Sequence, residues 1–183
     1  MPVIAEKQYT VEDYERLEEG APYQLIGGEL VMTPSPTPFH QSIAANIISV
    51  LKPFVDRAKL GKLLPAPLDV YLSDEDVYQP DLIFIRADRA KALQKDKLRI
   101  IPDLVIEILS PSTAYYDFTH KKEMYCKCGV TEYWIIDPEN ETVEIMVKRG
   151  EIYQTERFLR KPAPLESSML PGFTMKLEDI FVF

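Results

Sequence analysis

Short hydrophobic runs and one long helical pattern predict a mixed α/β fold. Runs typical of buried strands lie at 82–85, 104–109 and 133–136. Between residues 40 and 60, hydrophobic side chains recur every three or four positions, which predicts an amphipathic helix that Pro53 kinks or splits. With a further helical stretch at 114–127, these elements predict helices packed against a mixed sheet.

Glycine and proline residues set the bounds of the other expected strands. Gly27 and Gly28 separate two strand-like runs, 23–26 and 29–32, as in a β-hairpin. The run 63–72 is expected to form one strand, which its prolines make bulged or confine to a sheet edge.

Two of the expected helices carry cap signals. Thr10 and Asp13 are spaced as in a capping box at the start of a short helix that continues through residue 19. A turn and N-cap at 110–113 precede the helix at 114–127, and Gly129 is expected to end it in a left-handed conformation.

The composition is that of one ordinary globular domain, expected to cover residues 1–183. Hydrophobic residues make up 46% of the chain and charged residues 27%. No apolar run approaches the roughly 20 residues that span a bilayer, and the acidic first twenty residues do not resemble a signal peptide. We therefore expect a soluble, cytoplasmic protein with no membrane partner.

Two carboxylates occur where buried strands are expected. Asp81 directly precedes the run 82–85, and Glu107 lies within the run 104–109. An ionised carboxylate in an apolar interior needs an ion pair, hydrogen bonds or a metal. If the two strands pair with Asp81 and Glu107 side by side on one face, their oxygens can bind one hard cation, Mg²⁺ or alternatively Mn²⁺.

A lysine is expected to reach the same place from the following helix. Asp117, Lys121 and Tyr125 are four residues apart and so share one helix face. An ammonium there would orient an attacking water or stabilise a pentavalent phosphorus transition state. Asp117 is interpreted as the ion-pair partner of Lys121, while Tyr125 and Trp134 are interpreted as core residues.

Three features near this set remain open from the residues alone. His40 is either a base or phosphate contact, or a cap or packing residue. Glu29 is either a site carboxylate or a solvated strand residue. The net charge of −8 argues against a protein that coats nucleic acid, yet residues 86–99 hold six bases and two acids. That stretch is either a cationic surface beside the site or a solvated connection.

These residues resemble the Uma family of restriction endonucleases, within the PD-(D/E)XK nuclease superfamily. The resemblance covers most of the chain and is carried by an ordered set of motifs: Tyr23 to Leu30, Ser35-Pro36, His40-Gln41, Pro80-Asp81, Glu107 to Ser112, Asp117 with Lys121 and Tyr125, and Gly129 to Trp134. A Pro-Asp dipeptide by itself carries no such information, whereas the ordered set is specific.

The resemblance implies a restriction-endonuclease-like α/β fold and a particular ligand set. Asp81 and Glu107 correspond to metal ligands, and the backbone carbonyl of Ile108 to a third. The superfamily's common pattern places the lysine two residues after the second acid, where this chain has Leu109, so Lys121 takes that role from the helix. The chain departs from the pattern at Gln24, which replaces an acid and would coordinate more weakly, and at Gly27, where Asp is common.

The function that follows is a divalent-metal-dependent endonuclease that hydrolyses DNA phosphodiester bonds. Asp81 and Glu107 would hold Mg²⁺ and Lys121 would position or activate water, with Gln24 and His40 as accessory residues. Cutting a duplex needs two active sites, so a homodimer is expected. Two alternatives stay open: a catalytically weak or inactive module that binds nucleic acid or a protein partner, and a purely structural buried ion network.

Overall fold

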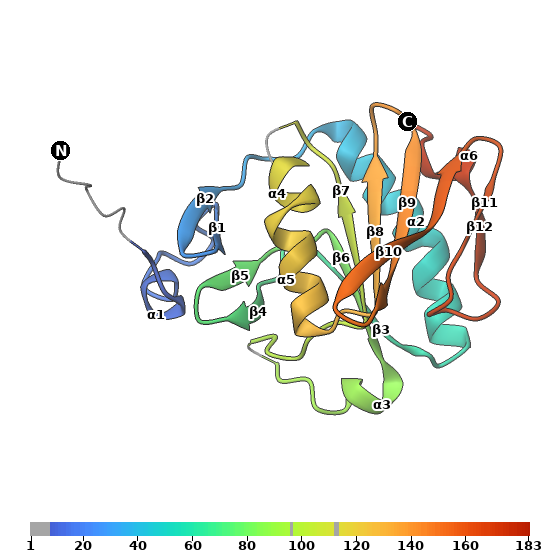
Figure 1. Cartoon of the computed structure of the whole chain (residues 1–183). Helices are drawn as coiled ribbons and strands as arrows, with labels where there is room; N and C mark the ends of the chain where they lie inside the picture. The colour runs from blue at the N-terminus through green and yellow to red at the C-terminus, as the bar shows by residue number, and fades with distance from the viewer. Residues whose placement is uncertain (1–7, 96, 112–113) are drawn as a thin grey trace.

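The central element of the fold is a mixed six-stranded sheet in the order β10-β9-β8-β7-β6-β3 (Figure 1). The computed structural model describes residues 8–95, 97–111 and 114–183. The strands of this sheet are β3 (Gly61–Pro65), β6 (Leu82–Arg86), β7 (Leu104–Ile108), β8 (Glu132–Asp137), β9 (Thr142–Arg149) and β10 (Ile152–Arg160). β7 and β8 are parallel, whereas every other neighbouring pair in this sheet is antiparallel.

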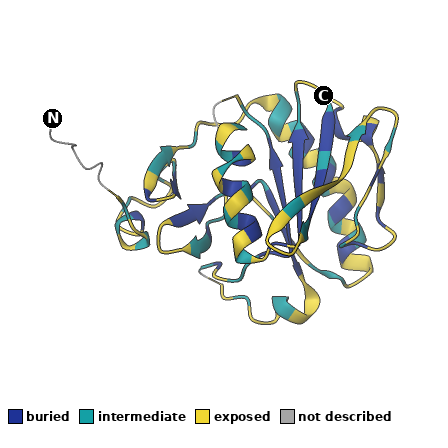
Figure 2. Ribbon diagram, viewed as in Figure 1, coloured by how far each residue is buried: buried dark blue, intermediate teal, exposed yellow. Residues whose placement is uncertain are grey.

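Helices cover both faces of this sheet. On one face lies α2 (Pro38–Arg57), whose buried side chains join β6, β7, β8 and β9 in the larger core cluster. On the other face lie α4 (Ala114–Phe118) and α5 (His120–Cys128), the latter contributing Tyr125 to a second cluster. The strands between these layers are buried on both faces (Figure 2). This arrangement confirms the predicted mixed sheet flanked by helices.

Smaller elements surround this central layer. A second sheet, ordered β2-β1-β5-β4, consists of β1 (Tyr23–Ile26), β2 (Glu29–Met32), β4 (Val70–Ser73) and β5 (Asp76–Tyr78). The remaining elements are α1 (Val11–Tyr14), α3 (Ala87–Ala90), β11 (Pro164–Glu166), β12 (Thr174–Lys176) and α6 (Leu177–Ile180). No helix in the described part of the chain is long and apolar enough to cross a membrane.

Several local predictions hold. β1 and β2 form the predicted hairpin, with positive φ values at Gly27 and Gly28 that suit glycine. Thr10 and Asp13 form the predicted capping box, although α1 ends at Tyr14 rather than near residue 19. Gly129 ends α5 in the left-handed conformation, as predicted.

Three further local predictions differ from the structure. α2 continues through Pro53 without a break. Pro53 has no N–H to donate to the Ser49 carbonyl, but both residues are exposed, so solvent can reach that carbonyl. The run 63–72 forms two strands in different sheets, since its prolines interrupt pairing. The helix expected at 114–127 is divided at Thr119, and residues 112–113 of its predicted N-cap region lie outside the described residues.

Candidate active site

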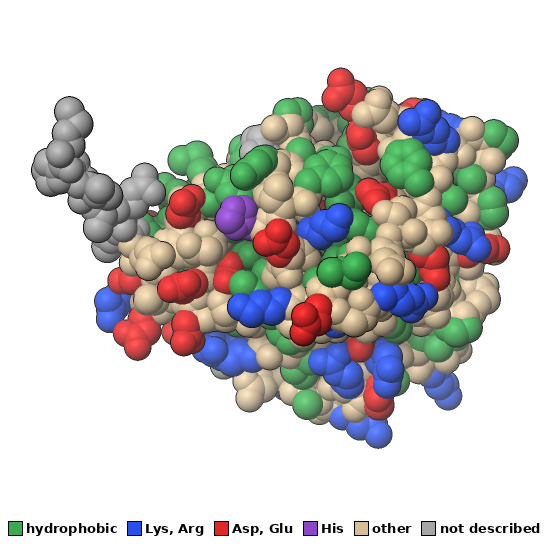
Figure 3. All heavy atoms as spheres, viewed as in Figure 1, with side chains coloured by type: hydrophobic (Ala, Val, Ile, Leu, Met, Phe, Trp, Pro, Cys, Tyr) green, Lys and Arg blue, Asp and Glu red, His purple; other side chains and the backbone are tan. Residues whose placement is uncertain are grey.

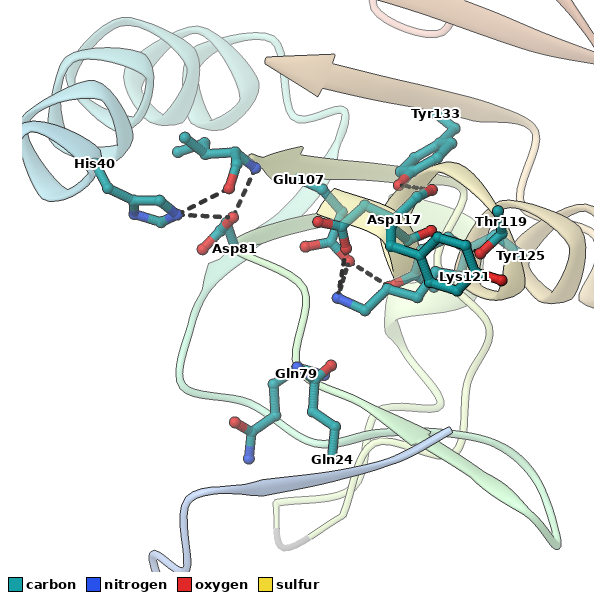
Figure 4. Close-up of polar contacts among 12 residues, drawn as sticks. Gln24, His40, Gln79, Asp81, Glu107, Asp117, Thr119, Lys121, Tyr125 and Tyr133 are labelled. Carbon is teal, nitrogen blue, oxygen red and sulfur yellow. Dashed lines mark hydrogen bonds and ion pairs between the residues drawn. The ribbon is translucent and has the colours of Figure 1, made fainter. Parts of the chain in front are cut away.

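Antiparallel pairing of β6 with β7 brings the two predicted carboxylates together. Leu82 lies opposite Ile106, and one step further in the same register places Asp81 opposite Glu107. Residues directly opposite each other project to the same face of a sheet. Asp81 is held there by a 2.7 Å hydrogen bond that the Ile108 amide donates to its Oδ2. The two side chains therefore face one space, as Figure 4 shows.

Lys121 reaches this space from α5, as its position on the helix predicted. Its Nζ lies 3.1 Å from Oε1 of Glu107 and 2.9 Å from Oδ1 of Asp117. All three side chains are at most 4% exposed. The i,i+4 ion pair between Asp117 and Lys121 is thus confirmed, and the pair extends inward to Glu107.

Tyr125 contributes more than packing to this cluster. Its hydroxyl donates a 2.8 Å hydrogen bond to the same Oε1 of Glu107 that Lys121 contacts. Burial raises the pKa of Tyr125 far above its usual range, so the hydroxyl keeps its proton. From the sequence alone, this residue is interpreted as a core residue. Its four-residue spacing from Lys121 was the signal that could have identified it as a site residue.

The buried cluster holds more carboxyl groups than cationic groups. The pKa of Glu107 is raised to about 8: burial raises it most, Lys121 lowers it, and the carboxylates of Asp117 and Asp81 raise it. Burial alone would lower the pKa of Lys121, but attraction to Glu107 and Asp117 outweighs it and raises that pKa. Lys121 therefore stays charged, and a cation bound beside Asp81 and Glu107 would favour the ionised form of Glu107.

His40 lies on the opposite side of the Asp81 carboxylate from Lys121 (Figure 4). Its Nε2 is 3.0 Å from the carbonyl oxygen of Ile108 and 3.4 Å from Oδ2 of Asp81. Because a carbonyl oxygen only accepts, Nε2 carries the hydrogen. Burial lowers the pKa of His40, yet its hydrogen bond and attraction to Asp81 raise the net value. His40 thus lies beside Asp81, and its role as a base or phosphate contact stays a prediction.

Gln24 and Glu29 occupy different surroundings. Gln24 is buried, and its Oε1 accepts a 2.8 Å hydrogen bond from the Gln79 amide, two residues before Asp81. Its carbonyl therefore fixes the segment that leads into Asp81. Glu29 is exposed on β2, in agreement with the solvated reading.

The basic stretch at 86–99 lies away from this cluster. Asp81 precedes β6, whereas Arg86 ends it, so the stretch begins at the opposite end of the strand. Ion pairs engage several of its cations: Arg86 with Asp88, Arg89 with Asp103, and both Lys97 and Arg99 with Glu15. These contacts support the interpretation of residues 86–99 as a connecting segment rather than as a cationic surface beside the site.

The donor set suits Mg²⁺ better than a transition metal. Among the residues that the structure describes, no three His, Cys, Asp or Glu side chains form a cluster able to hold a metal. Asp81, Glu107 and the Ile108 carbonyl instead offer hard oxygen donors. Mg²⁺ commonly binds one or two carboxylates and keeps water in its remaining positions.

Comparisons with known proteins agree with this architecture. The model of the Uma2 family, described as "Putative restriction endonuclease", matches residues 11–178. The crystal structure of "a putative nuclease belonging to DUF820" from Anabaena variabilis ATCC 29413 is similar, with a TM-score of 0.80 and 23% sequence identity. The match covers 94% of this chain and 97% of the other, and confirms the predicted restriction-endonuclease-like fold. A comparison with curated proteins gives no match.

Proposed function

Because the chain belongs to the Uma2 family, as its motifs predicted, we propose that it is a divalent-metal-dependent endonuclease that hydrolyses DNA phosphodiester bonds. One observation carries the proposal: Asp81, Glu107 and Lys121, from three separate segments, meet at one end of the β6–β7 pair. Two acids and a lysine around one space are the groups needed to bind a cation and to stabilise charge on phosphorus.

Asp81 and Glu107 would hold Mg²⁺ or Mn²⁺, with the Ile108 carbonyl as a further ligand. When bound, such a cation lowers the pKa of water and neutralises charge that develops on the phosphate. The Ile108 carbonyl has a second lone pair beside the one directed at His40, so both contacts are compatible.

Lys121 acts in this proposal as a hydrogen-bond donor rather than a base. Its raised pKa keeps the ammonium charged between Glu107 and Asp117. A charged lysine can orient the oxygen of an attacking water and stabilise the negative charge of the phosphorus transition state, but it cannot accept a proton. Glu107, Asp117 and Tyr125 hold the cluster in place through the contacts described above. Cutting both strands of a duplex needs two such sites, which a homodimer would supply.

Metal binding and cleavage should depend together on Asp81. We expect purified protein to nick or linearise plasmid DNA with Mg²⁺ or Mn²⁺ and to lose this activity in EDTA. Calorimetric titration with Mg²⁺ should give saturable binding that Asp81→Asn weakens strongly, because an amide is a poorer ligand than a carboxylate. The matched control is Asp56→Asn, an exposed aspartate on α2. Cleavage that persists in EDTA, or Mg²⁺ binding unchanged by Asp81→Asn, would contradict the proposal.

His40 is expected to act as a positioning residue for the metal ligands. Replacing it with alanine removes the hydrogen-bond donor from Asp81 and the Ile108 carbonyl, and should weaken Mg²⁺ binding roughly 10- to 100-fold, the usual effect of losing such a partner. His40→Gln places an amide near the position of Nε2 and should recover part of this loss. Calorimetry with Mg²⁺ measures both variants, and equal affinity in wild type and His40→Ala would refute the role.

A further inference from the structure

Two exposed aromatic rings lie on α4, the helix that contributes Asp117 to the proposed active site. Tyr115 is 67% exposed and Phe118 is 45% exposed, although α4 packs against the sheet through its other side. The two residues are three positions apart in one helix, so their side chains are neighbours on its surface. We propose that they form a stacking surface for unpaired nucleobases of a nucleic-acid strand whose phosphate enters the site. This inference rests on the proposed function, since it names how an unpaired segment of the DNA substrate would be held.

The Tyr115 ring is held in a defined orientation. It packs edge-on against Tyr116, with ring centroids 5.7 Å apart and planes at 77°, and it also contacts the ring of His120. Tyr116 in turn packs against the buried cluster that contains Tyr125. The carbonyl of Tyr115 accepts a 2.6 Å hydrogen bond from the Thr119 hydroxyl. A ring fixed in this way loses little conformational freedom when a base stacks on it.

The helix that carries these rings also contributes to the catalytic cluster. Asp117, which lies between the two rings in sequence, binds Nζ of Lys121 from the buried side of α4. His120 lies next to the turn of the β1–β2 hairpin. The Nδ1 atom of His120 is 3.9 Å from the position that a Cβ on Gly27 would occupy. That hairpin carries Gln24, whose oxygen fixes the approach to Asp81. Figure 3 shows hydrophobic side chains beside a histidine on the molecular face that carries α4 and α5.

Unpaired bases suit this surface better than an intact duplex. Bases within a duplex are covered on both sides by their neighbours, whereas unpaired bases offer open faces to aromatic side chains. Duplex binding relies mainly on cations placed along the phosphate backbone. Here the chain carries a net charge of −8, and ion pairs engage several cations of its most basic stretch. Stacking therefore supplies affinity that charge does not.

Binding of short oligonucleotides tests the proposal. Fluorescence anisotropy in EDTA measures affinity without cleavage, for a fluorescein-labelled single strand and for the matching duplex. We expect wild type to bind the single strand more tightly than the duplex. Tyr115→Ala and Phe118→Ala should each weaken single-strand binding about tenfold, and Tyr115→Phe should not, because it keeps the ring. Circular dichroism confirms that each variant keeps its fold.

Phe158→Ala is the matched control, because Phe158 is 55% exposed on β10, away from α4. Its affinity for the single strand should equal that of wild type. The proposal is overturned if Tyr115→Ala and Phe118→Ala bind the single strand as tightly as wild type, or if they lose equal affinity for single strand and duplex. It is also overturned if the sedimentation coefficient of these variants without DNA differs from that of wild type, because the rings would then belong to a contact between copies of the chain.

The same measurements separate this inference from the proposed endonuclease activity. Ring-dependent single-strand binding in a protein that fails to cleave with Mg²⁺ or Mn²⁺ supports the stacking surface and overturns the catalytic proposal. Metal-dependent cleavage combined with unchanged binding by the alanine variants overturns the stacking surface alone.

Discussion

Glu107→Gln is expected to lower metal-dependent cleavage at least 10²- to 10³-fold while leaving the metal-free fold as stable as wild type or more stable. The loss of activity follows from removing a metal ligand and with it the charge stabilisation that the cation supplies. The fold tolerates the change because the amide oxygen can still accept from Tyr125, and because Lys121 keeps Asp117 as its ion-pair partner.

The stability of Glu107→Gln relative to wild type should depend on pH. Burial raises the pKa of Glu107 from 4.5 to about 8, so the folded protein holds this proton more tightly than the unfolded chain. Wild type should therefore lose stability as pH rises from about 4.5 to about 8, a slope that Glu107→Gln lacks. The stability of the variant relative to wild type should be greatest near and above pH 8, where unfolding in urea with EDTA measures it.

Glu29→Gln is the matched control, because Glu29 is exposed on β2 and should affect neither cleavage nor stability. A loss of 3–5 kcal/mol in Glu107→Gln, about the usual cost of breaking a buried ion pair, would instead indicate that Asp81, Glu107 and Lys121 form a structural ion network. That outcome would favour the noncatalytic alternatives over the endonuclease.

Lys121→Met is expected to have the second large effect, on activity and on stability together. Cleavage should fall roughly 10²- to 10³-fold, the usual cost of removing a group that stabilises transition-state charge. The change also leaves Glu107 and Asp117 buried without the ammonium between them, which should lower the free energy of unfolding by about 3–5 kcal/mol at pH 8. Lower pH should recover part of this loss, because Glu107 then takes up a proton.

Three controls make the result at Lys121 decisive. Lys122→Met alters the adjacent lysine, which points about 100° away around the helix, and should leave cleavage and stability unchanged. Lys121→Arg keeps the charge with a different geometry, so it should fold even if Lys121→Met does not, yet cleave more slowly than wild type. A wild-type cleavage rate in Lys121→Met, measured on plasmid with Mg²⁺, would remove this residue from the mechanism.

The spacing of residues close together in the sequence predicted several features of the fold. The glycine pair at 27–28, the capping box at Thr10 and the end of α5 at Gly129 depend only on residues close in sequence, so they were predictable. Splitting of the run 63–72 between two sheets was not, because it depends on which partner each half finds. Proline signals likewise failed at Pro53, where exposure to solvent allows α2 to continue.

The sequence by itself determined the acidic pair, the lysine and their helix and strand positions, because burial makes an unpaired carboxylate costly and periodicity sets the face of each side chain. Only the tertiary structure decided that Tyr125 bonds Glu107, that His40 contacts Asp81 and the Ile108 carbonyl, and that distant acids such as Glu15 and Asp103 pair with cations of the basic stretch. Such contacts join residues far apart in sequence, and chain packing sets their distances.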